Sequence, residues 1–230
     1  MNELEDLKKF TDKKQLKIKE KKTNAMKFNT AVSYDFPPEL HIEGFENNLE
    51  VVTATKLLGI MITNDLKWAA NTEYICKKAY KKIWALRRMK VLDVDPLVIW
   101  YVYTKEIRSL LELAVPAWHS GLTFKQSTDI ERVQKVAVQI ILSDCSTGKS
   151  DFTYDMALVV LNLEPLYVRR ERLCLSFATK TLKSRHKNIF SINGSQYNTR
   201  GRSKFSETHS NTKRFYNSPV NYLTRLLNTR

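Results

Sequence analysis

Hydrophobic and polar positions alternate with a helical period through most of the chain. Apolar residues three, four or seven positions apart predict five consecutive helices, over residues 68–91, 95–114, 123–143, 152–162 and 165–184. Each segment gathers its apolar positions on one face, which must be buried against another element. The pattern therefore predicts that the C-terminal part of the chain is an all-α bundle.

Local signals predict some of the helix boundaries. Asp95 precedes Pro96, which places a capping carboxylate just before a residue whose missing N–H costs nothing in the first helical turn. Pro116 is expected to end the same helix. The third helix has three candidate N-caps ahead of its apolar stripe: Ser127, Thr128 and Asp129.

The N-terminal part has a mixed pattern. Apolar residues recur at helical spacing up to Lys14, and residues 25–28 have the composition of a strand. Two β-rich runs follow, at residues 49–53 and 56–63, and Gly59 lies inside the second, where a strand glycine often permits close approach of another backbone. We predict a hairpin or small sheet here, and hence a mainly α fold with a small α+β N-terminal region.

The C-terminal end is polar and basic. After Ser184 the chain is rich in Asn, Ser, Thr, Gly and Arg, and its apolar residues return near residue 215. We expect residues 191–212 to be flexible and the segment after them to form a short terminal helix. The predicted organisation is a small N-terminal region (1–66), a helical bundle (67–187) and a basic polar tail (188–230).

The charge of the chain indicates the class of partner that it binds. The 230 residues include 38 Lys and Arg against 24 Asp and Glu, a net charge of +14 with a pI near 9.6. Residues 72–90 and 200–230 each hold seven basic residues and one acidic residue, and residues 164–187 hold seven and two. Nucleic acid is the first candidate partner for such a basic chain, and an anionic lipid surface is the second.

Composition also disfavours other classes of protein. The apolar runs stay short of the roughly 20 residues that span a bilayer, and the N-terminus is acidic, so we expect neither a membrane-spanning nor a secreted protein. Cys76, Cys145 and Cys174 lie far apart, which predicts neither a disulfide framework nor a zinc knuckle. An intracellular location, in the nucleus or the cytoplasm, fits this pattern.

The helix predicted over residues 72–90 has two opposite faces. Its apolar positions fall on one side: Ile75, Ala79, Ile83 and Leu86. Lys77, Lys81 and Arg88 fall nearly opposite, with Trp84 beside them. Cations one turn apart can meet successive phosphates, and an indole next to them can stack on a sugar or base. The alternative is an ordinary solvated face whose tryptophan covers a neighbour.

Several stretches occur in a recognisable order. Residues 16–28 are LKIKEKKTNAMKF, residues 56–62 are KLLGIMI, and residues 64–68 are NDLKW. In order and spacing they resemble motif D, motif E (the primer-grip hairpin) and the link to the thumb in the reverse transcriptases of non-LTR (LINE-like) retrotransposons. Lys19 replaces the Asn of the family's L-x-I-N-x-x-K-T-x-x-M-x-F pattern. The resemblance continues into the helical region that follows the thumb link in these polymerases, at residues 103–118, 130–135 and 169–174 of this chain.

The resemblance implies the C-terminal part of an RNA-directed DNA polymerase, a transposable-element fragment in which a palm remnant with its β-hairpin precedes a thumb-like bundle. The family's paired aspartates, which hold two Mg²⁺ ions, belong to earlier palm motifs, and this sequence contains no Asp-Asp pair. We expect the missing upstream polymerase region to precede Met1 in the parent element. This chain alone is expected to be inactive, with no cofactor, no membrane contact, and RNA or DNA, in particular a primer–template duplex, as its partner.

The resemblance also assigns conditional roles. Lys22 matches the motif D lysine that assists pyrophosphate release in an intact polymerase, and Lys21 is its neighbour in a basic run. Leu58 and Gly59 match the primer-grip turn, where a missing side chain lets a nucleic-acid backbone come close. A solvated lysine and a structural hairpin glycine are the alternatives. The predicted nucleic-acid-binding set is Lys21, Lys22, Leu58, Gly59, Lys77, Lys81, Trp84 and Arg88.

Two other interpretations stay open. Residues 72–90 also resemble a short N-terminal segment of AlkB-type repair and tRNA methyltransferase proteins. However, none of the four histidines begins a His-x-Asp pair, and the six glycines are not clustered as a methyltransferase needs. Such a label would be inherited from one short basic helix. The remaining interpretation is a non-catalytic helical interaction module without a nucleic-acid partner.

Overall fold

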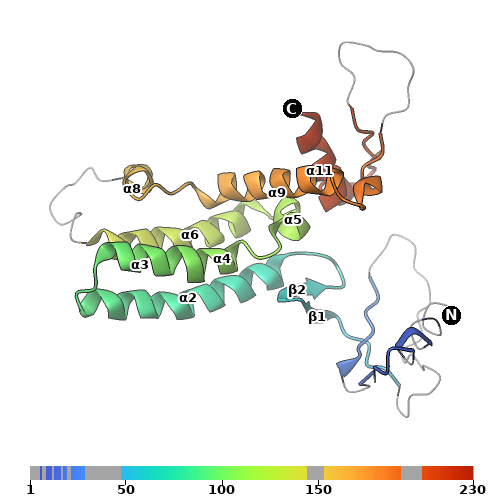
Figure 1. Ribbon diagram of the computed structural model, residues 1–230, viewed down its shortest axis with the longest axis horizontal. Coiled ribbons are helices and arrows are strands. Elements are labelled where there is room, and N and C mark those ends of the chain that lie inside the picture. The colour runs from blue at the N-terminus through green and yellow to red at the C-terminus, as the bar shows by residue number, and fades with distance from the viewer. Residues whose placement is uncertain are drawn as a thin grey trace. The chain divides into compact units, whose positions relative to one another are not determined.

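The chain forms two compact units, Met1–Lys67 and Trp68–Arg230. The computed structural model describes residues 6, 9–11, 13–16, 18–19, 22–28, 48–143, 153–192 and 204–229. The first unit contains a β-hairpin, and the second is helical (Figure 1). The prediction of a mainly α chain with a small β region is therefore confirmed.

The hairpin of the first unit consists of β1 (Ala54–Leu57) and β2 (Ile60–Thr63), paired antiparallel. Its two turn residues, Leu58 and Gly59, both have positive φ, 48° and 92°. Two central residues with positive φ are what a type I′ turn requires, and the twist of that turn matches the twist of the flanking strands. Gly59 adopts this conformation without steric cost, whereas Leu58 is strained.

The strand pairing differs from the prediction. Residues 56–63 do not form one long strand beside residues 49–53, because the turn at Leu58 and Gly59 folds this run back on itself. Val51 makes only an isolated parallel bridge with Ala25. Gly59 therefore serves a turn and not a strand interior.

The second unit is built from helices that mostly follow the predicted ranges. Their bounds are α2 (Ala69–Val91), α3 (Pro96–Val102), α4 (Arg108–Leu111), α5 (Val115–Trp118), α6 (Phe124–Ile141), α8 (Tyr154–Val160), α9 (Leu166–Leu182), α10 (Lys213–Tyr216) and α11 (Pro219–Asn228). A π-helical segment, η2 (Tyr103–Ile107), joins α3 to α4, and two short 3₁₀ turns, η3 (His119–Gly121) and η4 (Lys187–Ile189), follow α5 and α9.

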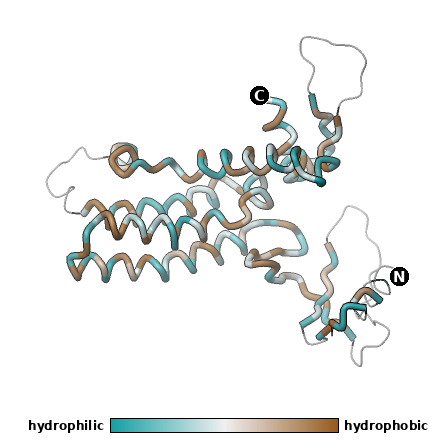
Figure 2. The backbone as a smooth tube through the Cα atoms, in the orientation of Figure 1, coloured by the Kyte–Doolittle hydropathy of each residue, from teal (hydrophilic) through white to brown (hydrophobic). Residues whose placement is uncertain are grey.

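The helices bury one apolar side each. Helix α2 packs against α6 and against the α3–η2–α4 run, while α9 packs against α5, α6 and α11 (Figure 1). Brown and teal positions alternate along these helices in Figure 2, as amphipathic helices require. The four apolar positions predicted for the inner face of α2 are at most 3% exposed: Ile75, Ala79, Ile83 and Leu86.

Two boundary predictions are corrected. Pro116 does not end a helix, because it lies in the first turn of α5, where proline fits. The preceding helical run stops at Leu111, and Ala114 turns the chain with a left-handed backbone (φ 50°). The cap of α6 is Thr123, not one of the three polar residues predicted. Thr123 forms a capping box with Gln126, in which each side chain bonds the other residue's backbone N–H.

The remaining features of the second unit agree with simple local rules. The Asp95 carboxylate accepts a hydrogen bond from Leu97 N at 2.7 Å, so the predicted cap of α3 is confirmed. Half of the segment 191–212 that is expected to be flexible, residues 193–203, lies outside the described residues. In the part of the chain that the structure describes, no helix has the length and apolar character needed to cross a membrane.

Candidate nucleic-acid interface

Helix α2 presents a continuous exposed stripe. Lys77, Lys81, Trp84 and Arg88 are spaced four, three and four residues apart, which places them within one narrow sector of the helix. We call these four residues the α2 stripe. All four side chains are exposed, and Trp84 is 65% exposed. The predicted separation of a basic face from an apolar face is therefore present in the structure.

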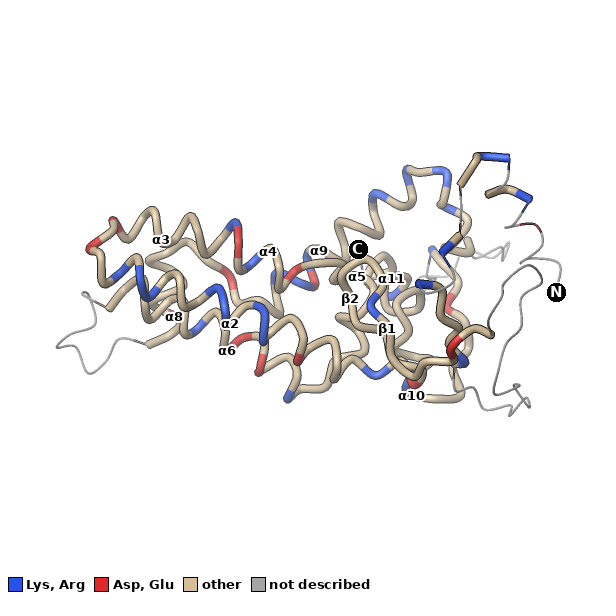
Figure 3. The backbone as a smooth tube through the Cα atoms, turned by 90° about the horizontal axis from the view of Figure 1, so that it is seen from below, with Lys and Arg blue, Asp and Glu red and all other residues tan. Residues whose placement is uncertain are grey.

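The cations of the α2 stripe have no acidic partner in the part of the chain that the structure describes. Among the ion pairs of the described residues, none involves Lys77, Lys81 or Arg88. The Arg88 guanidinium lies 5.9 Å from the centroid of the Trp84 ring, a cation–π distance. Figure 3 shows further basic positions along the same helix. The stripe can therefore offer its full positive charge to a ligand.

The inner contacts of α2 hold the stripe outward. Thr72 Oγ1 donates to Trp68 O at 2.9 Å at the start of the helix. The Trp68 indole packs on Gly121, where a Cβ would lie 2.5 Å from the ring. Burial raises the pKa of the Cys76 thiol to about 11, which keeps it neutral within the packed face. Rotating α2 would expose this face, so the stripe has one stable orientation.

The other predicted contact residues belong to the first unit. Lys22 is exposed, and its backbone N–H donates to Lys19 O at 3.0 Å. Leu58 is 89% exposed at the tip of the hairpin, next to Gly59. Lys21 lies outside the described residues. The structure therefore brings together the four residues of the α2 stripe, and that geometry is complete without the N-terminal candidates.

The Asp93–Asp95 link is not arranged to hold the Mg²⁺ pair of an intact polymerase. Such a site needs carboxylates that are free to ligate two metal ions. Of the two aspartates that stand closest together in sequence, Asp95 is engaged as the cap of α3, and Asp93 lies in a turn with φ 54°. Across the described ranges, no group of three or more His, Cys, Asp or Glu side chains is arranged to hold a metal.

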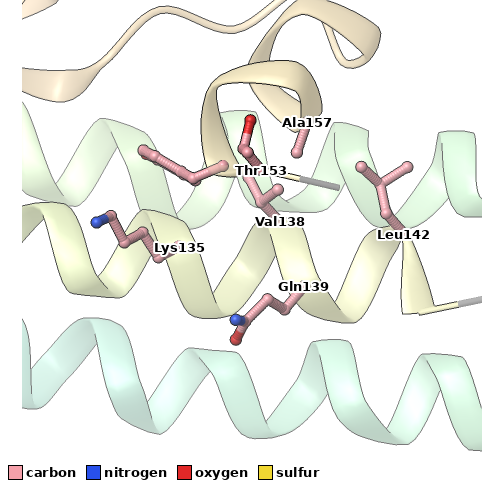
Figure 4. A pocket seen from close by; sticks show the side chains of 7 residues that line it. Lys135, Val138, Gln139, Leu142, Thr153 and Ala157 are labelled. Atoms are coloured by element: carbon pink, nitrogen blue, oxygen red, sulfur yellow. The ribbon is translucent and has the colours of Figure 1, made fainter. Parts of the chain in front are cut away.

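A pocket of about 200 Å³ lies between α6 and α8 (Figure 4). Its lining is formed by Lys135, Val138, Gln139, Leu142, Thr153, Tyr154 and Ala157. Three of the polar members already have structural roles: Lys135 lies 4.9 Å from the Tyr154 ring centroid, and Thr153 caps α8. The pocket therefore carries no arrangement of a nucleophile and a base.

Some buried polar residues were not anticipated from the sequence. Gln134 is fully buried and accepts from Tyr103 Oη at 2.5 Å. The Glu131 carboxylate accepts from Leu166 N at 2.9 Å and from Tyr154 Oη at 2.6 Å, and so caps α9. The sequence feature that could have revealed Gln134 as a buried polar residue is its position among the apolar residues on one face of α6. This network joins α6 to α8 and α9, with Gln134 buried and Glu131 and Tyr154 partly exposed.

Arg170 is a second unanticipated residue. It is fully buried, its Nη2 donates to Ser127 Oγ at 2.6 Å, and its Nε lies 3.4 Å from Nδ1 of His119. Burial, and then the nearby guanidinium, lower the pKa of His119 to about 4. The imidazole is thus neutral and able to accept at neutral pH.

Compared with protein families, with curated proteins and with solved structures, the chain shows no significant match.

Proposed function

We propose that the chain is a nucleic-acid-binding module that corresponds to the C-terminal, thumb-like part of a non-LTR retrotransposon reverse transcriptase. The observation that carries the proposal is the α2 stripe, a line of cations with no ion pair among the described residues, beside an exposed indole, on a helix whose other side is buried. The resemblance of residues 16–28 and 56–68 to the family's motifs supports the parentage.

The arrangement suits a phosphate backbone with little sequence preference. Lys77, Lys81 and Arg88 meet phosphates, which position a nucleic acid without reading its bases. Trp84 adds stacking, which every base can provide. An RNA or DNA duplex and a single strand are therefore both expected ligands. Since the Mg²⁺-binding carboxylates are missing, the purified chain should incorporate no nucleotides on a primed template.

The salt dependence of binding tests the proposal. If the three cations neutralise three phosphates, replacing all of them by Ala lowers the slope of log affinity against log salt by about 2.7 on duplex DNA and about 2.1 on a single strand. The matched control replaces three cations that are already paired with acids, in the triple variant Lys82→Ala, Arg132→Ala and Arg172→Ala. This control removes the same net charge and should lower the slope less.

An equal slope change in the two triple variants would contradict the proposal, because net charge alone would then explain binding. Circular dichroism of both variants establishes that α2 is still folded. A chain that binds neither DNA nor RNA at low salt would also contradict it.

A second candidate is the non-catalytic interaction module. It is favoured by apolar side chains that stay exposed where α2 meets α3 and on the nearby α8: Val91, Leu92, Leu97 and Val159, each at least 69% exposed. Trp100 Nε1 donates to Leu161 O at 3.0 Å and ties α3 to the end of α8. A partner that binds this end would be insensitive to salt, which separates it from nucleic acid.

A further inference from the structure

Another pairing of an exposed ring with a cation lies near the C-terminus. The guanidinium of Arg225 on α11 lies 3.7 Å from the centroid of the Tyr216 ring on α10. Its Nη1 also donates to Tyr216 O at 2.8 Å, which fixes the guanidinium over the ring. Tyr216 nevertheless remains 48% exposed. The ring is therefore covered by a cation on one side and is accessible to a ligand.

The surroundings of Tyr216 are basic. Lys213 and Arg214 are exposed on α10, and Lys213 lies three residues before Tyr216, on the same side of the helix. Over residues 204–229, all of which the structure describes, the single acidic residue is Glu207. Neither Lys213 nor Arg214 has an ion-pair partner among the described residues.

Hydrogen bonds hold α10 and α11 together. Thr212 caps α10 by accepting from Phe215 N at 3.2 Å, and Asn221 Nδ2 donates to Phe215 O at 3.0 Å. Helix α11 in turn packs against α9 and α5. A ring held in this way loses little conformational freedom on binding, so stacking on it is not offset by an ordering cost.

We infer that Tyr216, backed by Arg225, is a second base-stacking platform that takes an unpaired nucleotide, with Lys213 and Arg214 contacting the adjoining phosphates. The inference rests on the proposed function and extends it to a surface separate from the α2 stripe. It repeats the chemistry of Trp84 and Arg88 on different helices. A stacked base requires a single-stranded region, because the faces of bases inside a duplex are covered by their neighbours.

The test uses the full chain and a single-stranded oligonucleotide of about 12 nucleotides with 2-aminopurine at one position, a length within the usual site sizes. Stacking quenches 2-aminopurine fluorescence. Tyr216→Ala should weaken binding about 5-fold or more and reduce the quenching. Tyr216→Trp should keep both, because the indole provides a larger ring.

Tyr167→Ala is the matched control. Tyr167 is also an exposed tyrosine, 56% exposed on α9, but Glu164 and Glu171 lie three residues before it and four after it. This substitution should leave affinity and quenching unchanged. Equal losses in Tyr216→Ala and Tyr167→Ala, or unchanged binding in both, would overturn the inference.

The outcomes separate this inference from the proposed function. Loss of binding in the α2 triple variant with unchanged binding in Tyr216→Ala overturns the second platform and leaves the proposed function standing. The opposite result supports the platform and removes the α2 stripe from the binding surface. A Tyr216→Ala effect on phosphatidylserine vesicles, with none on the oligonucleotide, overturns the inference in favour of a lipid surface.

Discussion

Helices α2 and α9 are both rich in basic residues and use them in opposite ways. The cations of the α2 stripe are exposed and form no ion pair with any described acidic residue. On α9, Arg169 pairs with Glu112, Arg172 pairs with Glu164 at 2.9 Å, and Arg170 is fully buried. In the sequence, the two basic segments have nearly the same charge balance. Only the positions of the acidic residues that pair with these cations distinguish the candidate binding surface on α2 from the structural role of the arginines on α9.

The energetics explain why the two helices should respond differently to mutation. An exposed ion pair contributes little, because both charges are well hydrated and screened when apart. A buried charge that loses its partner is costly, because it remains out of water without compensation. Changes around α9 should therefore alter folding stability, and changes on the α2 stripe should alter binding.

The largest expected effect is on the carboxylate that holds α9. Glu112 is largely buried; it pairs with Arg169, and Arg108 Nε lies 3.8 Å from it. Glu112→Ala leaves two guanidinium groups half-buried without their acid and should lower the free energy of unfolding by about 3 kcal/mol. Urea unfolding with an unchanged m-value measures this loss. The control Glu106→Ala breaks an exposed pair and should leave the midpoint in place; equal midpoints for the two variants would refute the contrast.

The next effect is a loss of stability in acid. His119 has a pKa of about 4 in the folded chain, below the unperturbed value near 6.5. Between these values the unfolded chain binds more protons, so stability falls as the pH is lowered from about 6.5 towards 4, by on the order of 2 kcal/mol. His119→Gln should flatten this dependence in urea titrations at several pH values. His186→Gln, at an exposed site, should not, and a steep dependence that persists in His119→Gln would exclude this residue as the cause.

The sequence predicted the inner face of α2 because its apolar residues recur with the helical period, which needs only local information. The same period placed Gln134 on the apolar face of α6, but its partner Tyr103 lies on another helix, so the network could not be seen. The β-rich pattern placed Gly59 inside a strand for a different reason: Leu58 is a poor turn residue by composition, yet it adopts positive φ beside Gly59 and the two form the hairpin turn. Local patterns predicted helix faces and secondary-structure elements. The buried hydrogen bonds depend on contacts between segments that are distant in sequence.

Local sequence patterns also could not predict which cations of α2 form ion pairs. Lys82 is one residue from Lys81 in sequence, yet Lys82 Nζ lies 2.5 Å from Glu106, which stands 24 residues later. Lys77 and Lys81 form no ion pair with Glu106. Helical periodicity therefore predicted the exposed stripe, and only the packing of α2 beside η2 shows which cation is neutralised.

A smaller effect is expected at the indole of the α2 stripe. Trp84→Ala should weaken single-strand binding by about 1–2 kcal/mol, with the salt slope unchanged, because stacking involves no counterion release. Folding stability should hardly change, since Trp84 is mostly exposed. Phe124→Ala is the control, because Phe124 is 90% exposed on another helix. A changed salt slope in Trp84→Ala would show that the residue acts by positioning Arg88 and not by stacking.

The smallest effect converts one paired cation of α2 into an unpaired one. Glu106→Gln removes the only acidic partner of Lys82 among the described residues and leaves a side chain of the same shape. If the α2 surface contacts a nucleic-acid backbone, the freed ammonium adds to the phosphate contacts. The slope of log affinity against log salt on duplex DNA should then steepen by up to about 0.9. Binding should tighten at low salt, and the difference should vanish at high salt, where screening removes it.

The double variant Glu106→Gln with Lys82→Ala isolates the cause of that change. It lacks both members of the pair, so its slope should return to that of the unsubstituted chain or fall slightly below it. A slope that stays steep in the double variant would attribute the gain to the lost negative charge of Glu106 and not to Lys82. In that case Lys82 would not contact the nucleic acid, and the binding surface would be limited to the α2 stripe. The contrast between paired and unpaired cations would then distinguish α2 from α9 but would not distinguish Lys82 from its neighbours on α2.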